Sequence, residues 1–298
     1  MTKVDEDKLK SWNNGSIKNS IVDFLRSTVE DGSDYIKPED RIATFDNDGT
    51  LWVERPIPVQ ADFMFHSFKK SAQQDPSLAC QQPYKAILEN DSAFISDILK
   101  QSPDAIMSLE KAMARAWNGK TPKEFELEVK EFIKTAKHLK FSVFYTDLVY
   151  KPMLELFDLL KHYNYRIFVC SGGGRDFMRV IAEDTWDIHK ENVIGTAPEY
   201  EYKNGELRRI NKVLGGISLG PGKVEHIFAR TGRLPVFAAG NSNCDMDMLN
   251  CAKYKLVVNH DDHEREYSYD KGAGKLINNA KKYDFNILSM KKDWKVIF

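Results

Sequence analysis

The spacing of apolar residues divides the chain into segments with different expected structures. Residues 17–29 carry isoleucine, phenylalanine, leucine and valine at helical spacing, which predicts an amphipathic helix. From residue 53 to about residue 150 the pattern is again mostly helical. Two helix starts are visible there, Ser102-Pro103 and Thr121-Pro122, each a capping residue followed by proline at the first helical position.

The remaining chain alternates short apolar runs with helical segments. The runs of strand length are residues 41–45, 166–170, 192–196, 235–239 and 255–259. The helical segments between them are residues 152–162, a stretch from about residue 176, and residues 224–231. Asn204-Gly205 separates two further short runs, which predicts a β-hairpin. A last run, Trp294–Phe298, is compatible with an additional edge strand.

Alternating strands and helices are typical of a parallel sheet covered on both faces. We therefore predict an α/β fold with a Rossmann-like three-layer core. Residues 1–52 and 151–298 are expected to form this core. Residues 53–150 are expected to form a mostly α-helical cap domain inserted after the first core strand.

Polar residues follow several of the predicted strands at the point where each strand ends. Asp46 and Asp48 follow the first strand, Ser171 follows the second, and Asn241 follows a later one. Lys223 opens the helix before that later strand. Because ligands of such sheets bind beyond the carboxyl ends of the strands, we expect these side chains to meet at one edge.

Composition and charge narrow the function classes. The 298 residues carry a formal net charge of -1 and no long basic run, so an extended nucleic-acid surface is not indicated. The chain has no apolar stretch long enough to cross a membrane, and its first residues lack the apolar core of a secretory signal. We expect a cytoplasmic protein whose four cysteines are reduced.

Four short motifs lie at the expected edge: FDNDGT (45–50), VCSGGG (169–174), GPGK (220–223) and GNSNCD (240–245). An acid pair, a small hydroxyl residue with glycines, a lysine and an amide-acid pair are each common in ordinary turns. Together, in this order and context, they resemble the motifs of the haloacid dehalogenase (HAD) superfamily. The resemblance covers residues 41 to 260 and is closest to the phosphoserine phosphatase-like branch, which has a helical cap between the first two motifs.

The chemistry of the acid pair can be argued from its residues. A carboxylate such as Asp46 can attack phosphorus in line and form an aspartyl-phosphate that water then hydrolyses. Asp48 can protonate the leaving oxygen and later deprotonate the water. Two neighbouring carboxylates resist being charged together, which suits one base and one acid.

The resemblance implies further roles. Mg²⁺ would be bound by Asp46, the carbonyl oxygen of Asp48, and the side chains of Asn241 and Asp245, an oxygen set of the kind Mg²⁺ prefers. One departure from the family pattern is Asn241, where an aspartate is usual, because an amide contributes no charge. The remaining implied roles are phosphate binding by Ser171, Lys223 and the amides of Asn47 and Gly172, and substrate contacts by Glu54 and Arg175.

The leading hypothesis is a Mg²⁺-dependent phosphomonoesterase acting on a small phosphorylated metabolite, without nucleic-acid or membrane partners. A sugar phosphomutase would use the same aspartyl-phosphate and stays open, as does a non-catalytic phosphate-binding protein of the same fold. A dehalogenase is disfavoured, because it typically lacks an acid at position 48. The sequence leaves the substrate and the oligomeric state open.

A polar run follows the last of the predicted strands. His260–Glu264 is expected to form a solvated loop.

Overall fold

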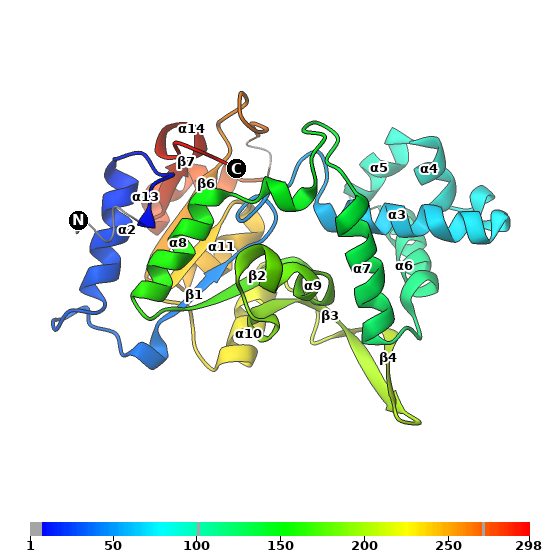
Figure 1. The fold of residues 1–298 in the computed structure, drawn as a ribbon, viewed down its shortest axis with the longest axis horizontal. Helices are drawn as coiled ribbons and strands as arrows, with labels where there is room; N and C mark the ends of the chain where they lie inside the picture. Colours follow the sequence, from blue (N-terminus) through cyan, green and yellow to red (C-terminus); the bar gives the residue numbers. More distant parts are fainter. Residues whose placement is uncertain (1–7, 100–101, 270–271) are drawn as a thin grey trace. The chain divides into compact units, whose positions relative to one another are not determined.

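The computed structural model describes residues 8–99, 102–269 and 272–298 (Figure 1). It divides into two compact units. The core unit comprises residues 1–56, 137–196 and 215–298, and the helical unit comprises residues 57–136 and 197–214. Residues 1–7 of the expected core lie outside the described residues.

The core unit contains six strands of a parallel sheet, in the order β3-β2-β1-β5-β6-β7. Their bounds are Ile42–Phe45 (β1), Arg166–Gly174 (β2), Val193–Lys203 (β3), Phe237–Gly240 (β5), Tyr254–Asn259 (β6) and Asn286–Ser289 (β7). Every residue of β1 and β5 is buried, as expected for interior strands covered on both faces. The predicted α/β architecture is therefore confirmed.

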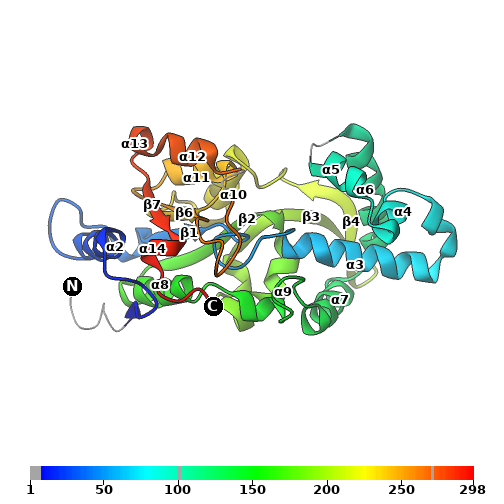
Figure 2. The same cartoon turned by 90° about the horizontal axis from the view of Figure 1, so that it is seen from above.

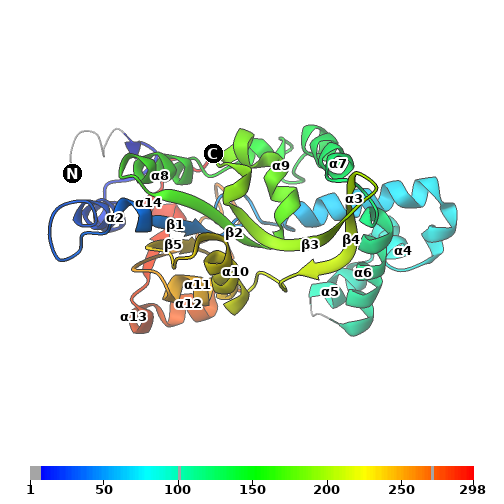
Figure 3. The same ribbon diagram turned by 90° about the horizontal axis from the view of Figure 1, so that it is seen from below.

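Helices cover both faces of this sheet (Figures 2 and 3). One face carries α8 (Lys151–His162) and α9 (Arg175–Trp186). The other face carries α10 (Pro221–Thr231), α11 (Met246–Asn250), α12 (Gly274–Asn278) and α13 (Ala280–Tyr283). The core unit also contains α2 (Ser16–Ser27), α14 (Met290–Asp293) and the short 3-10 helices Pro38–Asp40, Tyr145–Leu148, Lys190–Asn192 and Asn243–Asp245.

In its described residues, the helical unit has five helices, a short 3-10 helix and a β-hairpin. The helices are α3 (Val59–Gln74), α4 (Tyr84–Glu89), α5 (Ser92–Leu99), α6 (Pro103–Trp117) and α7 (Pro122–Thr135), and the 3-10 helix is Pro76–Cys80. Thr121 caps α7 as predicted: its Oγ1 accepts from the amide of Glu124, whose side chain accepts from the amide of Thr121. Phe63, Trp117 and Phe125 pack together in its interior.

The predicted hairpin is confirmed. β3 continues past Thr196 and pairs in antiparallel fashion with β4 (Glu206–Leu214), which completes the seven-strand order β4-β3-β2-β1-β5-β6-β7. Asn204 and Gly205 have φ values of 53° and 83°, the left-handed conformation that a two-residue hairpin turn requires.

The division into units differs in detail from the expected segment 53–150. Residues 53–56 and 137–150 belong to the core unit, because the two chain segments pair there: the amide of Val53 donates to Leu148 (3.1 Å) and that of Tyr150 to Leu51 (2.8 Å). The hairpin belongs to the helical unit, where the amide of Gly119 donates to the carbonyl of Arg209 (2.7 Å).

The expected edge strand at Trp294–Phe298 is wrong. The last strand is β7, and Trp294 instead forms an isolated bridge with Trp12. The two tryptophan rings also pack edge to face, with their centroids 6.2 Å apart. No helix within residues 8–99, 102–269 and 272–298 is long and apolar enough to cross a membrane.

Candidate active site

The loop after β1 starts at an interior position of the sheet. The amide of Asp46 donates to the carbonyl of Ala239 (2.9 Å), so pairing with β5 continues one residue past β1. The carbonyl of Asn47 then accepts from the amide of Leu51 (2.8 Å), which closes a tight turn. The turn leaves Asp46 and Asp48 just beyond the carboxyl end of β1, where the sequence predicts them.

Lys223 connects residues from three parts of the sheet edge. Its ammonium group is buried and donates to Asp46 Oδ1 (2.5 Å), Asp245 Oδ1 (2.5 Å) and the carbonyl of Cys170 (3.0 Å). Burial alone would lower the pKa of Lys223, but the carboxylates of Asp245 and Asp46 outweigh burial and raise that pKa above its ordinary value. Lys223 therefore carries a permanent positive charge beside the predicted nucleophile.

The two acids of the β1 loop hold their protons unusually well. Burial, reinforced by the nearby carboxylate of Asp245, raises the pKa of Asp46 from 3.8 to about 8, against the opposing effect of Lys223. Burial also raises the pKa of Asp48 to about 7, although the indole N–H of Trp52 donates to its Oδ1 (2.9 Å) and favours the charged form. Without a metal both carboxyls therefore keep their protons up to near neutral pH, and a cation bound beside Asp46 would favour its ionised form over that of Asp48.

This pKa shift predicts how stability depends on pH when metal is removed. Because folding raises the pKa of Asp46 from 3.8 to about 8, its contribution to stability is complete below the unfolded value and is lost as pH rises through about 8. In EDTA, the melting temperature should fall between about pH 6 and about pH 8 more in the parent chain than in an Asp46→Asn variant. Equal falls in the two proteins would contradict the shift.

Three oxygen atoms converge near Asn241. The Oδ1 end of the Asn241 side-chain amide lies 3.2 Å from Thr50 Oγ1, 3.1 Å from the carbonyl oxygen of Asp48 and 3.3 Å from Asp46 Oδ2. Adjacent oxygens around an octahedral Mg²⁺ are about 3 Å apart, given ligand distances of about 2.1 Å. The carboxylate of Asp46, the carbonyl of Asp48 and the amide of Asn241 therefore fit the predicted ligand set.

Asp245 does not contribute to this oxygen cluster. Its Oδ1 accepts from Lys223, and its Oδ2 accepts from the amides of Asn241 (3.1 Å) and Ser242 (2.9 Å). Both of its oxygens thus accept hydrogen bonds from the protein, and its role as a ligand beside Asn241 stays a prediction. Within the described parts of the chain, no group of three or more His, Cys, Asp or Glu side chains is placed to hold a metal.

The second motif lies where β2 stops pairing regularly. The register between β2 and β3 shifts between Ser171 and Gly174. Ser171 is buried, and its Oγ accepts from the amide of Gly173 (3.1 Å). A β-carbon at Gly172 would lie 2.2 Å from Leu219 Cδ2, so a larger residue there would displace the exposed side chain of Leu219. Ser171 and Gly172 thus reach the same sheet edge as the β1 loop, as predicted.

The sequence model of the haloacid dehalogenase-like hydrolases matches residues 43–250, which include the β1 loop and all four motifs. The chain belongs to the haloacid dehalogenase-like hydrolases. The predicted superfamily is confirmed, and with it the hydrolase class. No curated protein sequence matches this hydrolase.

Solved structures that are similar to this chain come from several bacteria. A conserved, functionally unknown protein from Anaerococcus prevotii has a TM-score of 0.62 at 14% identity, with 97% of each chain covered. A protein of unknown function from Bordetella pertussis has a TM-score of 0.54 at 16% identity, with 83% of this chain and 97% of that chain covered. A phosphoserine phosphohydrolase-like protein from Francisella tularensis has a TM-score of 0.46 at 16% identity, covering 83% of this chain and 94% of that chain. The first two likenesses show the shared fold.

The two predicted substrate residues of this hydrolase differ in their surroundings. Glu54 lies beside the oxygen cluster, where its Oε2 accepts from the hydroxyl of Tyr269 (2.7 Å) and from the amide of Asn241 (3.3 Å). Arg175 begins α9, and its Nε donates to the neighbouring Asp176 (3.1 Å). The structure therefore brings Glu54, rather than Arg175, into contact with a motif residue.

The loop expected to be solvated at His260 is partly buried. His260 is 3% exposed, and its Nε2 lies 2.7 Å from the carbonyl oxygen of Gly49 in the β1 loop. Its Nδ1 lies 3.1 Å from Glu266 Oε2, on a side chain that is also buried. No local pattern reveals this contact, because Gly49 and His260 are 211 residues apart.

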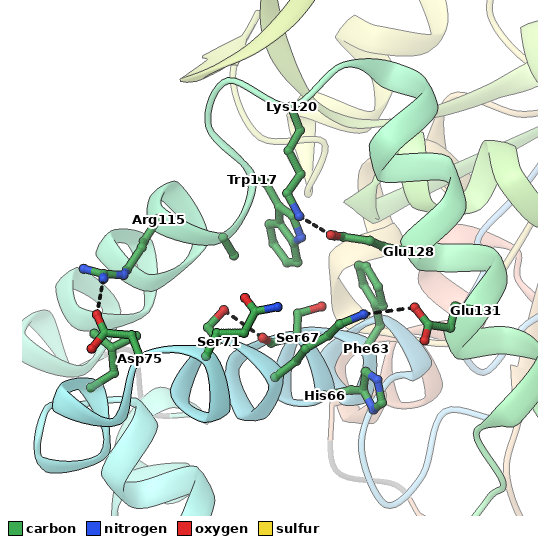
Figure 4. A pocket seen from close by; sticks show the side chains of 14 residues that line it. Phe63, His66, Ser67, Ser71, Asp75, Arg115, Trp117, Lys120, Glu128 and Glu131 are labelled. Carbon is green, nitrogen blue, oxygen red and sulfur yellow. Dashed lines mark hydrogen bonds and ion pairs between the residues drawn. The ribbon is translucent and has the colours of Figure 1, made fainter.

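The helical unit contains a cavity of about 300 Å³ (Figure 4). Its wall includes the aromatic rings of Phe63 and Trp117. Three ion pairs also line it: Lys70–Glu131 (3.0 Å), Arg115–Asp75 (2.6 Å) and Lys120–Glu128. Because each of these cations faces an anion, the cavity has no excess charge with which to select an ionic ligand.

Proposed function

We propose that this hydrolase is a Mg²⁺-dependent phosphomonoesterase that acts on small phosphorylated metabolites through an aspartyl-phosphate at Asp46. The supporting observation is that the two carboxylate oxygens of Asp46 face different partners. Asp46 Oδ1 accepts from Lys223, while Oδ2 faces the oxygen cluster of Asp48 and Asn241. A carboxylate held in this way is fixed in orientation, with Lys223 balancing its charge on one side and a bound Mg²⁺ able to balance it on the other.

In the first half-reaction, Asp46 attacks phosphorus and the bond to the leaving oxygen breaks. Asp48 donates its proton to that oxygen, a role that suits a carboxyl whose pKa is raised to about 7. Lys223 keeps Asp46 oriented and balances charge on the transferring phosphoryl group.

In the second half-reaction, the now ionised Asp48 removes a proton from water. The water attacks phosphorus, phosphate leaves, and Asp46 is regenerated. Mg²⁺ bound by Asp46, the Asp48 carbonyl and Asn241 would offset the repulsion between the nucleophile and the substrate dianion. Asp245 acts here as a positioning residue, because its contacts are with Lys223 and with backbone amides.

The phosphoryl oxygens would be bound by Ser171, by Lys223 and by the amides of Asn47 and Gly172. A glycine run at a strand end allows backbone N–H groups to approach an anion closely. The buried Oδ1 of Asn47 accepts no hydrogen bond from any residue in the described ranges, so it is available to a donor on a ligand.

The helical unit is proposed as the cap, because most of it is inserted in the chain between β1 and β2. A cap that excludes bulk water favours small soluble substrates over phosphoproteins.

The direct test is phosphate release from p-nitrophenyl phosphate and a panel of small phosphomonoesters. We expect turnover with Mg²⁺, loss of turnover in EDTA, and recovery when excess Mg²⁺ is restored. Folding is checked in parallel by thermal unfolding. A folded, Mg²⁺-loaded protein that releases phosphate from no ester in the panel would contradict the proposal.

A further inference from the structure

The amide of Asn241 has two possible orientations with opposite consequences. The inner side of this amide is the end that faces Thr50, Asp48 and Asp46. With nitrogen on the inner side, its N–H groups would point at Thr50 Oγ1, the Asp48 carbonyl and Asp46 Oδ2. With oxygen on the inner side, the oxygens of Asn241, Asp48 and Asp46 face one another, and only the Thr50 hydroxyl is placed to donate to that oxygen, an arrangement that a bound cation stabilises. The orientation of this amide therefore decides whether its oxygen can ligate a cation.

Glu54 favours the orientation with oxygen on the inner side. Its Oε2 lies 3.3 Å from the outer end of the Asn241 amide, and an ionised carboxylate can only accept hydrogen bonds. The amide nitrogen can donate to Glu54, whereas an amide oxygen in that place would face a negative charge. The hydroxyl of Tyr269 lies 3.4 Å from the same nitrogen and can accept its second proton.

Tyr269 is held in place from two sides. Its hydroxyl donates to Glu54 (2.7 Å), and its ring stacks on His260 at a centroid distance of 4.2 Å. His260 in turn contacts the carbonyl of Gly49 (2.7 Å). Burial, together with the charge of Glu54, raises the pKa of Tyr269, so its hydroxyl keeps the proton that it donates.

The packing around Gly49 leaves little freedom for the Asn241 side chain. A β-carbon at Gly49 would lie 2.1 Å from Asn241 Nδ2 and 2.8 Å from the hydroxyl of Tyr269. Gly49 has φ of 75°, a conformation that glycine adopts readily. Asn241 and Tyr269 therefore both pack directly against the backbone of the β1 loop.

We infer that Glu54 and Tyr269 are positioning residues that hold the oxygen of Asn241 toward a bound Mg²⁺. The inference rests on the proposed function, and it assigns Glu54 to orienting a metal ligand rather than to contacting substrate. Partners that orient a ligand typically contribute about 10- to 100-fold to metal affinity. A carboxylate at position 241 has two equivalent oxygens and needs no such orientation, so the effect should be specific to an amide there.

The test measures Mg²⁺ binding by isothermal titration calorimetry in four proteins: the parent, Glu54→Gln, Asn241→Asp and the double variant. Glutamine is a near-isosteric replacement for Glu54 that can both donate and accept, so the Asn241 amide becomes free to turn. We expect Glu54→Gln to weaken Mg²⁺ binding about tenfold or more when residue 241 is asparagine. We expect the same substitution to weaken binding less than about threefold in the Asn241→Asp background. Tyr269→Phe should also weaken binding in the parent background.

Equal losses in both backgrounds would overturn the inference, because Glu54 would then act by its charge alone. An unchanged affinity in Glu54→Gln would overturn it too, as would a parent chain that binds no Mg²⁺. Thermal unfolding of each variant in EDTA separates loss of folding from loss of binding. Phosphate release by the parent chain is measured separately, so Mg²⁺ binding without any turnover would count against the proposed function and leave this inference standing.

Discussion

An Asp46→Asn variant should release phosphate at least about 1,000-fold more slowly than the parent chain under saturating Mg²⁺. Asparagine has nearly the same shape, but its amide is a poor nucleophile and cannot form the aspartyl-phosphate. The loss should appear in kcat, measured by continuous phosphate release with the best substrate of the panel. The fold should survive, because Lys223 keeps Asp245 as its anionic partner.

An Asp184→Asn variant provides the matched control. Asp184 is an exposed residue of α9, so the same chemical change there should leave kcat within about twofold of the parent value. Retention of more than about a tenth of parent activity by folded Asp46→Asn protein would contradict the role of Asp46 as the nucleophile.

A Lys223→Met variant should show the largest loss of stability. Methionine fills most of the space of the lysine side chain but leaves the buried carboxylate of Asp245, and that of Asp46 wherever it is ionised, without a cationic partner. Removing one partner of a buried charge network typically costs about 3–5 kcal/mol. The measurement is urea-induced unfolding in EDTA, followed by circular dichroism near neutral pH, and activity should be lost as well.

Two further variants separate this effect from a general effect of losing a lysine. Lys253→Met removes an exposed charge and should change the free energy of unfolding by less than about 0.5 kcal/mol. Lys223→Met combined with Asp245→Asn should be more stable than Lys223→Met alone, because one unpaired carboxylate is gone. A Lys223→Met protein as stable as the parent would contradict the buried ion-pair network.

Local patterns are sufficient to predict the elements whose signals lie in a few neighbouring residues. Asn204-Gly205 favours the left-handed backbone of a two-residue turn, and the hairpin has that geometry. Thr121-Pro122 predicts the start of α7, and Thr121 caps that helix in the structure. The strand ends can be placed in the same way, which is why the sequence predicts Asp46 and Lys223 at one edge.

Features that depend on contacts distant in sequence could not be predicted. β7 is only four residues long, and its strand character comes from pairing with β6. The role of Asp245 depends on which donors surround it, and the motif spacing does not contain that information. The burial of His260 depends on its contact with Gly49 and on its pairing with Glu266, and neither follows from the polar run around it.

The most direct test of the central claim is to look for the phosphoryl group on Asp46. The chain is mixed with Mg²⁺ and its best substrate, quenched with acid during turnover, digested, and analysed by mass spectrometry. The account predicts that the peptide containing Asp46 gains the mass of one phosphoryl group, and that the Asp46→Asn variant shows no such gain. Rapid phosphate release with no phosphorylated Asp46 peptide in the parent chain, under conditions that preserve a reference acyl phosphate, would contradict it.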